Sequence, residues 1–328
     1  MFWHKYIYRL LGLFLLILPL SPTLAAADSA LETPVAAHLP DGVDYTHAQD
    51  TPHIRTLRQD ANTPRAVIDW QSFNIGEGAT VIFDQQAGSG SITVNRVVGG
   101  GTDPSKVLGK LTANGTVVIL DPNGVLFGTN AVIDVGGIVA STGTLTDQTA
   151  FLGGGALALS NMSGARPDAT VENLSHHFTV RDAGLAAFVA PIASNRGTIT
   201  ARLGHIRLAS GGAATLDFYG DRLLNITAPL TQPLPVGRSQ VENTGNLIAD
   251  GGHIALTARA AAAVVDQAIN TSGIVSAQKA NMRNGKIVLS GTEGIEDTRE
   301  NSILIGTNAK LQKAVDISTN DGSTTIHM

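Results

Sequence analysis

The chain has 328 residues, a formal net charge of −5 and 15% charged residues, against about 25% in an ordinary soluble domain. This mild charge argues against a nucleic-acid-binding surface. Its 36 glycines and few Glu, Lys and Arg leave it poor in helix formers. It has no cysteine, which excludes disulfides and thiolate metal sites.

The first 27 residues have the pattern of a secretory signal peptide. Lys5 and Arg9 precede an apolar run over residues 10–20, and the alanines at 25–27 suit a cleavage site. The run is shorter than the ~20 residues that a membrane span needs. We therefore expect export through the Sec translocon and cleavage near residue 27. Residues 28–64, which are polar and show no apolar period, are expected to form a loosely structured lead-in that caps the N-terminus.

From residue 65 onward the sequence predicts predominantly β structure. Short β-branched runs bounded by Gly, Asn or Asp predict strands at 80–83, 91–94 and 116–120. Residues 104–111 are the one helix-sized candidate, which Gly109 weakens.

A degenerate repeat indicates how these strands are arranged. The unit N-x-G-x-[IL]-x-A followed by G-x-I-x-L occurs at 195–208 and 243–256, and a looser third copy begins at Asn270 and ends at 285–289. Its apolar residues alternate, so one face of each strand is expected to be buried, and Gly or Asn at the joints is expected to supply the left-handed backbone of a corner. Stacked units of this kind predict a parallel β-helix. A sandwich of hairpins is the alternative, but it does not predict a recurring unit.

No pattern in the sequence indicates catalysis, a metal or a cofactor. The phosphate-loop, H-E-x-x-H and G-x-S-x-G motifs are missing. His176 and His177 are adjacent, so on a strand they would point to opposite faces and make a poor metal pair. The acidic stretch over 293–300 has no basic partner nearby and is expected to be a solvated loop. We therefore predict a protein that is not an enzyme.

The segment Asp121-Pro122-Asn123-Gly124 predicts a β-turn between two buried strands. Pro122 presets φ at the second position, Asn123 suits the third and Gly124 the fourth, while the Asp121 carboxylate is placed to accept a hydrogen bond from farther along the turn.

The surroundings of this turn resemble a known family. The motifs are DWQSFNIG at 69–76, VNRV at 94–97, LGKL at 108–111, ANG at 113–115, the turn itself, and VGGIVAST at 135–142. In this order they resemble the N-terminal secretion domain of filamentous-haemagglutinin-like exoproteins, the passengers of bacterial two-partner secretion. The resemblance runs from about residue 67 to 256. It implies an all-β fold: a right-handed parallel β-helix that forms a single elongated solenoid with extra-helical hairpins. The secretion domain would span 65–260, with additional β-helix coils over 261–328.

The resemblance also implies a function and a partner. The chain would be a secreted or surface-associated, adhesin-like exoprotein, exported through an outer-membrane two-partner secretion transporter, a TpsB-type β-barrel with periplasmic domains. The family's N-P-N-G turn matches Asp121, Pro122, Asn123 and Gly124, with Asp at the first position. The other candidate recognition residues from the matched motifs are Asn74, Asn95 and Arg96.

The family's second motif, N-P-N-L, has no counterpart here beyond Asn173-Leu174. Two other functions stay open at this point. One is a self-standing adhesin that binds host glycans or proteins. The other, less favoured, is a β-helical polysaccharide lyase or hydrolase.

Overall fold

A computed structural model describes residues 31–48, 51–162, 166–218, 224–260 and 267–276, and beyond them the strands β28 (Lys286–Ser290), β29 (Ile303–Ile305), β30 (Lys310–Gln312), β31 (Val315–Thr319) and β32 (Gly322–Ile326). The signal peptide expected at 1–27 and the acidic stretch at 293–300 lie outside the described residues. Within the described residues, no helix has the length and apolar character needed to cross a membrane.

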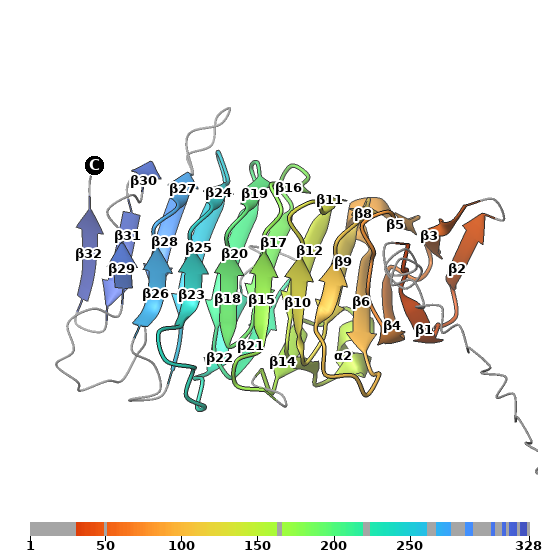
Figure 1. Ribbon diagram of the computed structural model, residues 1–328, viewed down its shortest axis with the longest axis horizontal. Coiled ribbons are helices and arrows are strands. Elements are labelled where there is room, and N and C mark those ends of the chain that lie inside the picture. Colours follow the sequence, from red (N-terminus) through yellow and green to blue (C-terminus); the bar gives the residue numbers. More distant parts are fainter. Residues whose placement is uncertain are drawn as a thin grey trace, which may run out of the picture.

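Three long sheets run along the molecule, and almost all of their neighbouring strands are parallel (Figure 1). Sheet A contains, in order, β1 (Val35–His38), β4 (Arg65–Ser72), β6 (Ile92–Val97), β9 (Thr116–Leu120), β12 (Gly137–Ser141), β17 (Leu185–Val189), β20 (His205–Ser210), β25 (His253–Ala258), β28, β31 and β32. Sheet B contains β2 (Val43–Ala48), β3 (Thr51–Gln59), β5 (Thr80–Gln85), β8 (Lys110–Ala113), β11 (Val132–Val135), β16 (His177–Val180), β19 (Thr198–Ala201), β24 (Asn246–Ile248), β27 (Ile274–Ser276) and β30. Sheet C contains β7 (Ser105–Val107), β10 (Gly124–Phe127), β15 (Thr170–Asn173), β18 (Ile192–Asn195), β23 (Ser239–Asn243), β26 (Gln267–Thr271) and β29.

From β6 onward each described coil passes through the three sheets in turn, so the fold is the predicted parallel β-helix. After β9 in sheet A the chain forms β10 in sheet C and β11 in sheet B, then returns to sheet A as β12, where Ile138 pairs with Val117. In a later coil Ile206 pairs with Ile254, many more residues away, because the intervening chain leaves the solenoid. The strands predicted at 80–83, 91–94 and 116–120 are confirmed as β5, β6 and β9.

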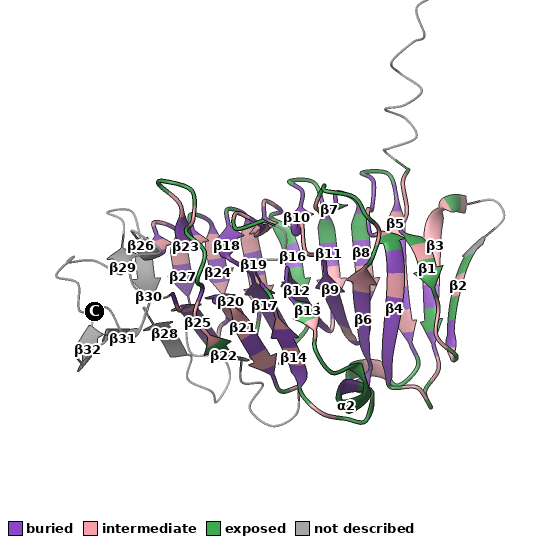
Figure 2. Ribbon diagram, turned by 90° about the horizontal axis from the view of Figure 1, so that it is seen from below, coloured by how far each residue is buried: buried purple, intermediate pink, exposed green. Residues whose placement is uncertain are grey.

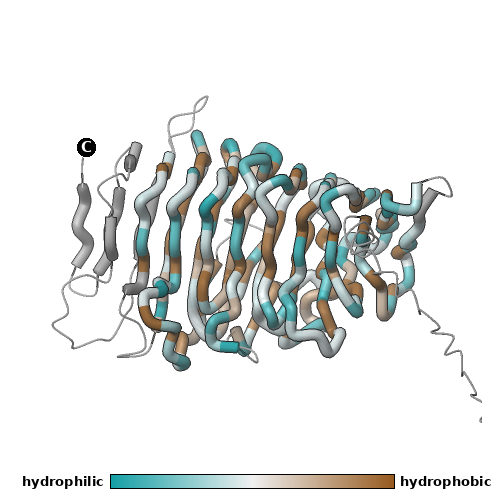
Figure 3. Tube along the Cα trace, viewed as in Figure 1, coloured by the Kyte–Doolittle hydropathy of each residue, from teal (hydrophilic) through white to brown (hydrophobic). Residues whose placement is uncertain are grey.

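The interior of the coils is a continuous apolar core (Figure 2). In sheet B the burial alternates, as in β19, where Ile199 and Ala201 are buried and the two threonines are half-buried. Each sheet contributes one ring to an aromatic group at mid-length: Phe127, Phe178 and Phe188, whose ring centroids lie 5.1 to 5.9 Å apart. Hydrophobic and hydrophilic segments accordingly alternate along the coils in Figure 3.

The outer face of sheet A is buried as well, which the alternating pattern did not predict. A four-stranded antiparallel sheet, β13 (Thr144–Leu145), β14 (Leu157–Ser160), β21 (Ala213–Leu216) and β22 (Leu224–Ala228), covers it together with helix α2 (Gln148–Leu152). Both faces of β9, β12 and β17 are therefore largely buried. These two insertions are the extra-helical hairpins that the family resemblance implied.

The corner after sheet C is held by a ladder of buried side chains. The Asn173 carboxamide donates to that of Asn195 at 2.8 Å, Asn195 donates to Asn243 at 2.8 Å, and Asn243 donates to the Thr271 hydroxyl at 3.3 Å. Thr271, and not Asn270, therefore takes the Asn position in the third repeat, which corrects the predicted start of that repeat.

The repeat glycines follow this ladder, and they serve a different purpose from the one predicted. Gly197 and Gly245 do not have positive φ. Instead, a Cβ at either residue would overlap a carbonyl oxygen of the preceding coil, that of Ser175 or Gly197. The corner thus needs glycine because the two backbones approach closely, which any side chain would prevent.

Two local predictions are wrong. Residues 28–64 are not a loose lead-in where the structure describes them, because they form β1, β2 and β3, and Tyr45 of β2 packs edge-on against Trp70 of the core. Residues 104–111 are not a helix: β7 and the start of β8 lie there, on either side of a corner at Gly109. Val107 and Leu111 face the core from two different sheets.

Candidate functional site

The turn at 121–124 has the geometry that its sequence predicts. The Gly124 N–H donates to the Asp121 carbonyl at 3.0 Å, and the Asn123 N–H donates to Asp121 Oδ1 at 2.9 Å. Gly124 has a φ of +119°, and a Cβ there would lie 2.5 Å from the carbonyl oxygen of Thr170. Only glycine is compatible with both conditions.

The Asp121 carboxylate also connects the turn to the preceding coil. Its Oδ2 accepts from the Ser105 N–H at 2.9 Å and from the Ser105 hydroxyl at 2.7 Å. Asp121 is 1% exposed. Burial raises the pKa of Asp121 above its ordinary value, against the opposing effect of the hydrogen bonds from Ser105 and Asn123. Three donors thus converge on one buried carboxylate.

Asn74 closes the neighbouring edge of sheet C. Its Oδ1 accepts from the Lys106 N–H at 2.9 Å, and the next residue, Ile75, donates its own N–H to the Lys106 carbonyl at 2.8 Å. A side-chain oxygen therefore replaces the backbone acceptor that a further strand would supply. The Asn74 amide also donates to Glu32 at 3.0 Å, which ties this edge to the chain before β1.

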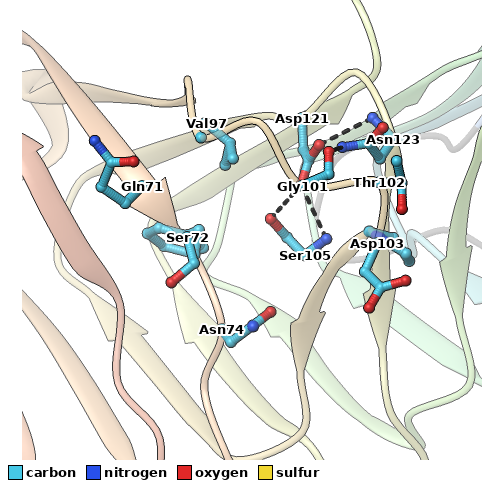
Figure 4. A pocket seen from close by; sticks show the side chains of 13 residues that line it. Gln71, Ser72, Asn74, Val97, Gly101, Thr102, Asp103, Ser105, Asp121 and Asn123 are labelled. Atoms are coloured by element: carbon cyan, nitrogen blue, oxygen red, sulfur yellow. Dashed lines mark hydrogen bonds between the residues drawn. The ribbon is translucent and has the colours of Figure 1, made fainter. Parts of the chain in front are cut away.

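A pocket of about 400 Å³ opens beside the turn, where the chain before Ile75 diverges from β7 (Figure 4). Gln71, Ser72 and Asn74 lie on one side, and Thr102, Asp103 and Asn123 lie on the other. Asn123 closes the rim by donating from Nδ2 to the Gly101 carbonyl at 2.9 Å. Ser105 and Asp121 complete the wall between them.

Of the seven sequence-predicted site residues, the structure brings Asn74, Asp121 and Asn123 together at this pocket. Pro122 and Gly124 belong to the same turn. Asn95 and Arg96 are neighbours on β6 and have different surroundings. Asn95 is fully buried, accepts from the Trp70 indole at 3.0 Å and donates to the Val118 carbonyl, so it acts on the fold and offers no surface to a partner.

Arg96 is partly exposed and forms a two-point ion pair with Asp69, with N–O distances of 2.7 and 3.0 Å. The hydrogen bond from Arg96 to Asp69 raises the pKa of the arginine further above its ordinary value. This pair links the first two parallel strands of sheet A, because Asp69 and Arg96 are register partners.

Sequence reasoning missed Ser105, Thr102 and Asp103 at this site. Ser105 lies in the segment that was expected to be helical, and no site was predicted at Thr102 or Asp103. The glycine run next to a Thr-Asp-Pro sequence was the available signal for a loop that folds over a sheet edge.

The sequence of this β-helix matches a known protein family. The model described as "TPS secretion domain" matches residues 35–304. The chain belongs to this family. Proteins of the TPS secretion domain family are secreted exoproteins of two-partner secretion, so the resemblance found in the sequence is confirmed.

Solved structures of secretion domains have the same fold. The HMW1 secretion domain from Haemophilus influenzae is similar over 87% of this chain and 83% of its own, with 21% identity and a TM-score of 0.61. The filamentous hemagglutinin secretion domain is similar over 89% and 98%, with 14% identity and a TM-score of 0.50.

Two curated relatives are named heme/hemopexin-binding protein, both from Haemophilus influenzae. They are 38% identical over 115 residues and 42% identical over 87 residues, which is 31% and 26% of this chain. The matched segments span only 12% and 9% of those proteins, so the resemblance concerns a small part of them.

Within the described residues, no three His, Cys, Asp or Glu side chains are grouped closely enough to hold a metal ion.

Proposed function

We propose that this chain directs its own export through an outer-membrane two-partner secretion transporter, a TpsB-type β-barrel with periplasmic domains. The observation that carries the proposal is the family match over residues 35–304, which includes every described coil up to β29. The predicted signal peptide at 1–27 would bring the chain to the periplasm through the Sec translocon. The exported chain is then released or kept at the cell surface as an adhesin-like, non-enzymatic exoprotein, with host glycans or proteins as its targets.

The architecture suits transport of an unfolded chain. Each coil contacts mainly its neighbours, so folding propagates from coil to coil as the chain emerges, without nucleotide hydrolysis. In a parallel β-helix every strand pairs with a strand from another coil, as Val117 does with Ile138. Such non-local pairing is slow to form, which leaves time for transport before the chain folds. We propose that 65–260 is the unit that carries recognition and that 261–328 adds further coils.

The turn at 121–124 is the proposed recognition element, together with Asn74 at the adjacent sheet edge. The supporting geometry is that Pro122 and Asn123 are half-buried and project at the surface, whereas Asp121 and Gly124 are buried and fix the turn. Arg96 lies on a neighbouring strand and is partly exposed. A partner that binds this surface would contact Pro122, Asn123 and Arg96 directly. It would depend on Asp121 only because Asp121 holds the turn in place.

The test compares export with folded stability. Full-length chain carrying an epitope tag is produced in a Gram-negative host with and without a two-partner transporter from the source organism. Pro122→Ala combined with Asn123→Ala is expected to lower the amount in the medium at least about fivefold, and to lower the midpoint of urea unfolding by much less. Thr179→Ala, on the exposed face of sheet B, is the matched surface control.

Equal losses in export and in stability would mean that the turn supports the fold and is not a recognition element. Export that does not depend on the transporter, while that transporter still exports its own passenger, would refute the proposed function itself.

A further inference from the structure

The pocket beside the turn holds side chains that the fold does not use. Gln71, Ser72, Thr102 and Asp103 line it, and none of the four makes a side-chain hydrogen bond or ion pair within the described part of the chain. By contrast Asn74, Asn123 and Asp121, in the same walls, are committed to the backbone or to Ser105. One carboxamide, two hydroxyls and one carboxylate are thus available to a ligand (Figure 4).

The charge of the pocket restricts the ligand. No Lys, Arg or His occurs among the residues that line it, so an anion would meet Asp103 and the buried Asp121 with no cationic partner. Arg166 interacts electrostatically with Asp103, but its guanidinium is paired with Asp168 at 3.1 Å. Anionic ligands are therefore disfavoured.

The hydrogen-bonding character of the four groups favours a polyhydroxylated ligand. Asp103 only accepts, whereas the carboxamide of Gln71 and the hydroxyls of Ser72 and Thr102 both donate and accept. The vicinal hydroxyl groups of a sugar each donate and accept, so they can pair with all four of these side chains. Val97 and Pro104 add half-buried apolar surface against which the C–H face of a sugar ring packs.

The site does not suit an added peptide strand. Lys106 is the residue of β7 whose backbone groups point to the open edge, and Asn74 and Ile75 already occupy both its N–H and its carbonyl. A peptide in the pocket would find no ladder to extend, so main-chain pairing would supply no affinity. The volume of about 400 Å³ lies within the range of small-molecule sites.

We propose that this pocket binds one neutral saccharide unit, with Asp103, Gln71, Ser72 and Thr102 as its hydrogen-bonding residues. Asp103 accepts from two adjacent hydroxyls, and Thr102 and Gln71 fix the orientation of the ring. This binding rests on the glycan targets of the proposed function, for which it names a site, and it does not depend on the export step. It gives the folded, exported domain a contact with glycans.

The experiment uses the folded full chain and saturation-transfer NMR with glucose, galactose, N-acetylglucosamine and lactose, followed by titration of the sugars that respond. For a single unit that makes few contacts we expect a dissociation constant on the order of 1 mM. Asp103→Asn and Thr102→Ala should each weaken binding at least about fivefold. Asp41→Asn and Thr179→Ala, which change an exposed carboxylate and an exposed threonine elsewhere, should not.

The proposal is overturned if none of these sugars responds at about 10 mM, or if binding survives both pocket variants. It is also overturned if an arginine- or lysine-rich peptide binds at the pocket and the sugars do not, since the site would then belong to a basic protein segment. Thermal melting of each variant confirms that the compared proteins are folded. Export of Asp103→Asn should equal that of the wild type, so failure of sugar binding and failure of the secretion proposal are distinguishable.

Discussion

The carboxylate of Asp121 accepts both the backbone N–H and the hydroxyl of Ser105, which lies 16 residues earlier and one coil away, at 2.9 and 2.7 Å. The same carboxylate accepts the Asn123 N–H through its other oxygen. A carboxamide has one acceptor oxygen and a donor in place of the second. In this chain, where the family's turn has Asn, an Asp therefore satisfies donors on both oxygens.

The buried position of Asp121 predicts a pH dependence of stability. Its pKa is raised in the folded state, so between the unfolded and folded pKa values the folded chain binds more protons than the unfolded chain. The stability that Asp121 contributes is thus fully present below its ordinary pKa of 3.8 and is lost as pH rises through its folded pKa. The free energy of unfolding of wild type minus that of Asp121→Asn should therefore fall as pH rises from 3 to 7.

Urea titrations of both proteins across this range check the sign. Asp168→Asn is the control with the opposite expectation, because hydrogen bonding to Arg166 lowers the pKa of Asp168. The stability that Asp168 contributes should be lost as pH falls through its folded pKa. The free energy of unfolding of wild type minus that of Asp168→Asn should therefore grow as pH rises. A difference for Asp121 that also grows with pH would mean that its hydrogen bonds outweigh its burial.

The asparagine ladder predicts two opposite effects on stability. Asn195→Leu leaves a donor of Asn173 and an acceptor of Asn243 unpaired in the interior, which should cost at least about 2 kcal/mol. Thr271→Asn should extend the ladder and raise stability by about 0.5–1.5 kcal/mol, because the present Asn243–Thr271 bond is long at 3.3 Å. Urea unfolding measures both. A destabilising Thr271→Asn would show that the fourth position has no room for the larger side chain.

The repeat glycines predict a steric effect with a matched control. Gly245→Ala places a Cβ against the Gly197 carbonyl of the coil before it, and neither backbone is free to move within the stacked sheets. Such overpacking should cost about 3 kcal/mol or more. Gly100→Ala, where a Cβ would meet nothing within 4 Å, should change stability by less than about 0.5 kcal/mol. Thermal melts of the two variants that shift equally would contradict the close-approach explanation.

The sequence predicted the solenoid because its signal is local and repeated. In 195–208 the apolar positions Ile199, Ala201, Ile206 and Leu208 alternate, and all of them face the core. The sequence did not predict that the outer face of sheet A is buried. Val118 and Val139 lie on this face, and they are buried only because the insertions cover them. Their cover comes from the insertions, whose strands, such as β14 and β21, pair across more than 50 residues of chain.

The candidate site was predictable only in part, for a similar reason. The turn at 121–124 is encoded by four consecutive residues, so its geometry followed from their preferences. Its partner Ser105 lies in a segment where Val107, Leu108 and Leu111 have helical spacing. A corner at Gly109 divides them between two sheets, and a short apolar run does not distinguish the two structures. Asn74 meets Lys106 only because the coils stack.

Arg65 predicts how the helical insertion is attached to the solenoid. From β4 its guanidinium donates to the carbonyls of Phe151 and Gly155 and lies 4.9 Å from the centre of the Phe151 ring, so one buried cation holds α2 and the turn after it. Both hydrogen bonds come from Nη1, and Arg65→Lys retains the charge but loses the planar guanidinium that lies over the Phe151 ring. It should destabilise the chain by about 1–3 kcal/mol and speed hydrogen exchange in 148–155 at least tenfold while leaving the exchange of β19 unchanged. Equal acceleration in β19 would mean that Arg65 supports the whole β-helix and that the insertion has no separate stability.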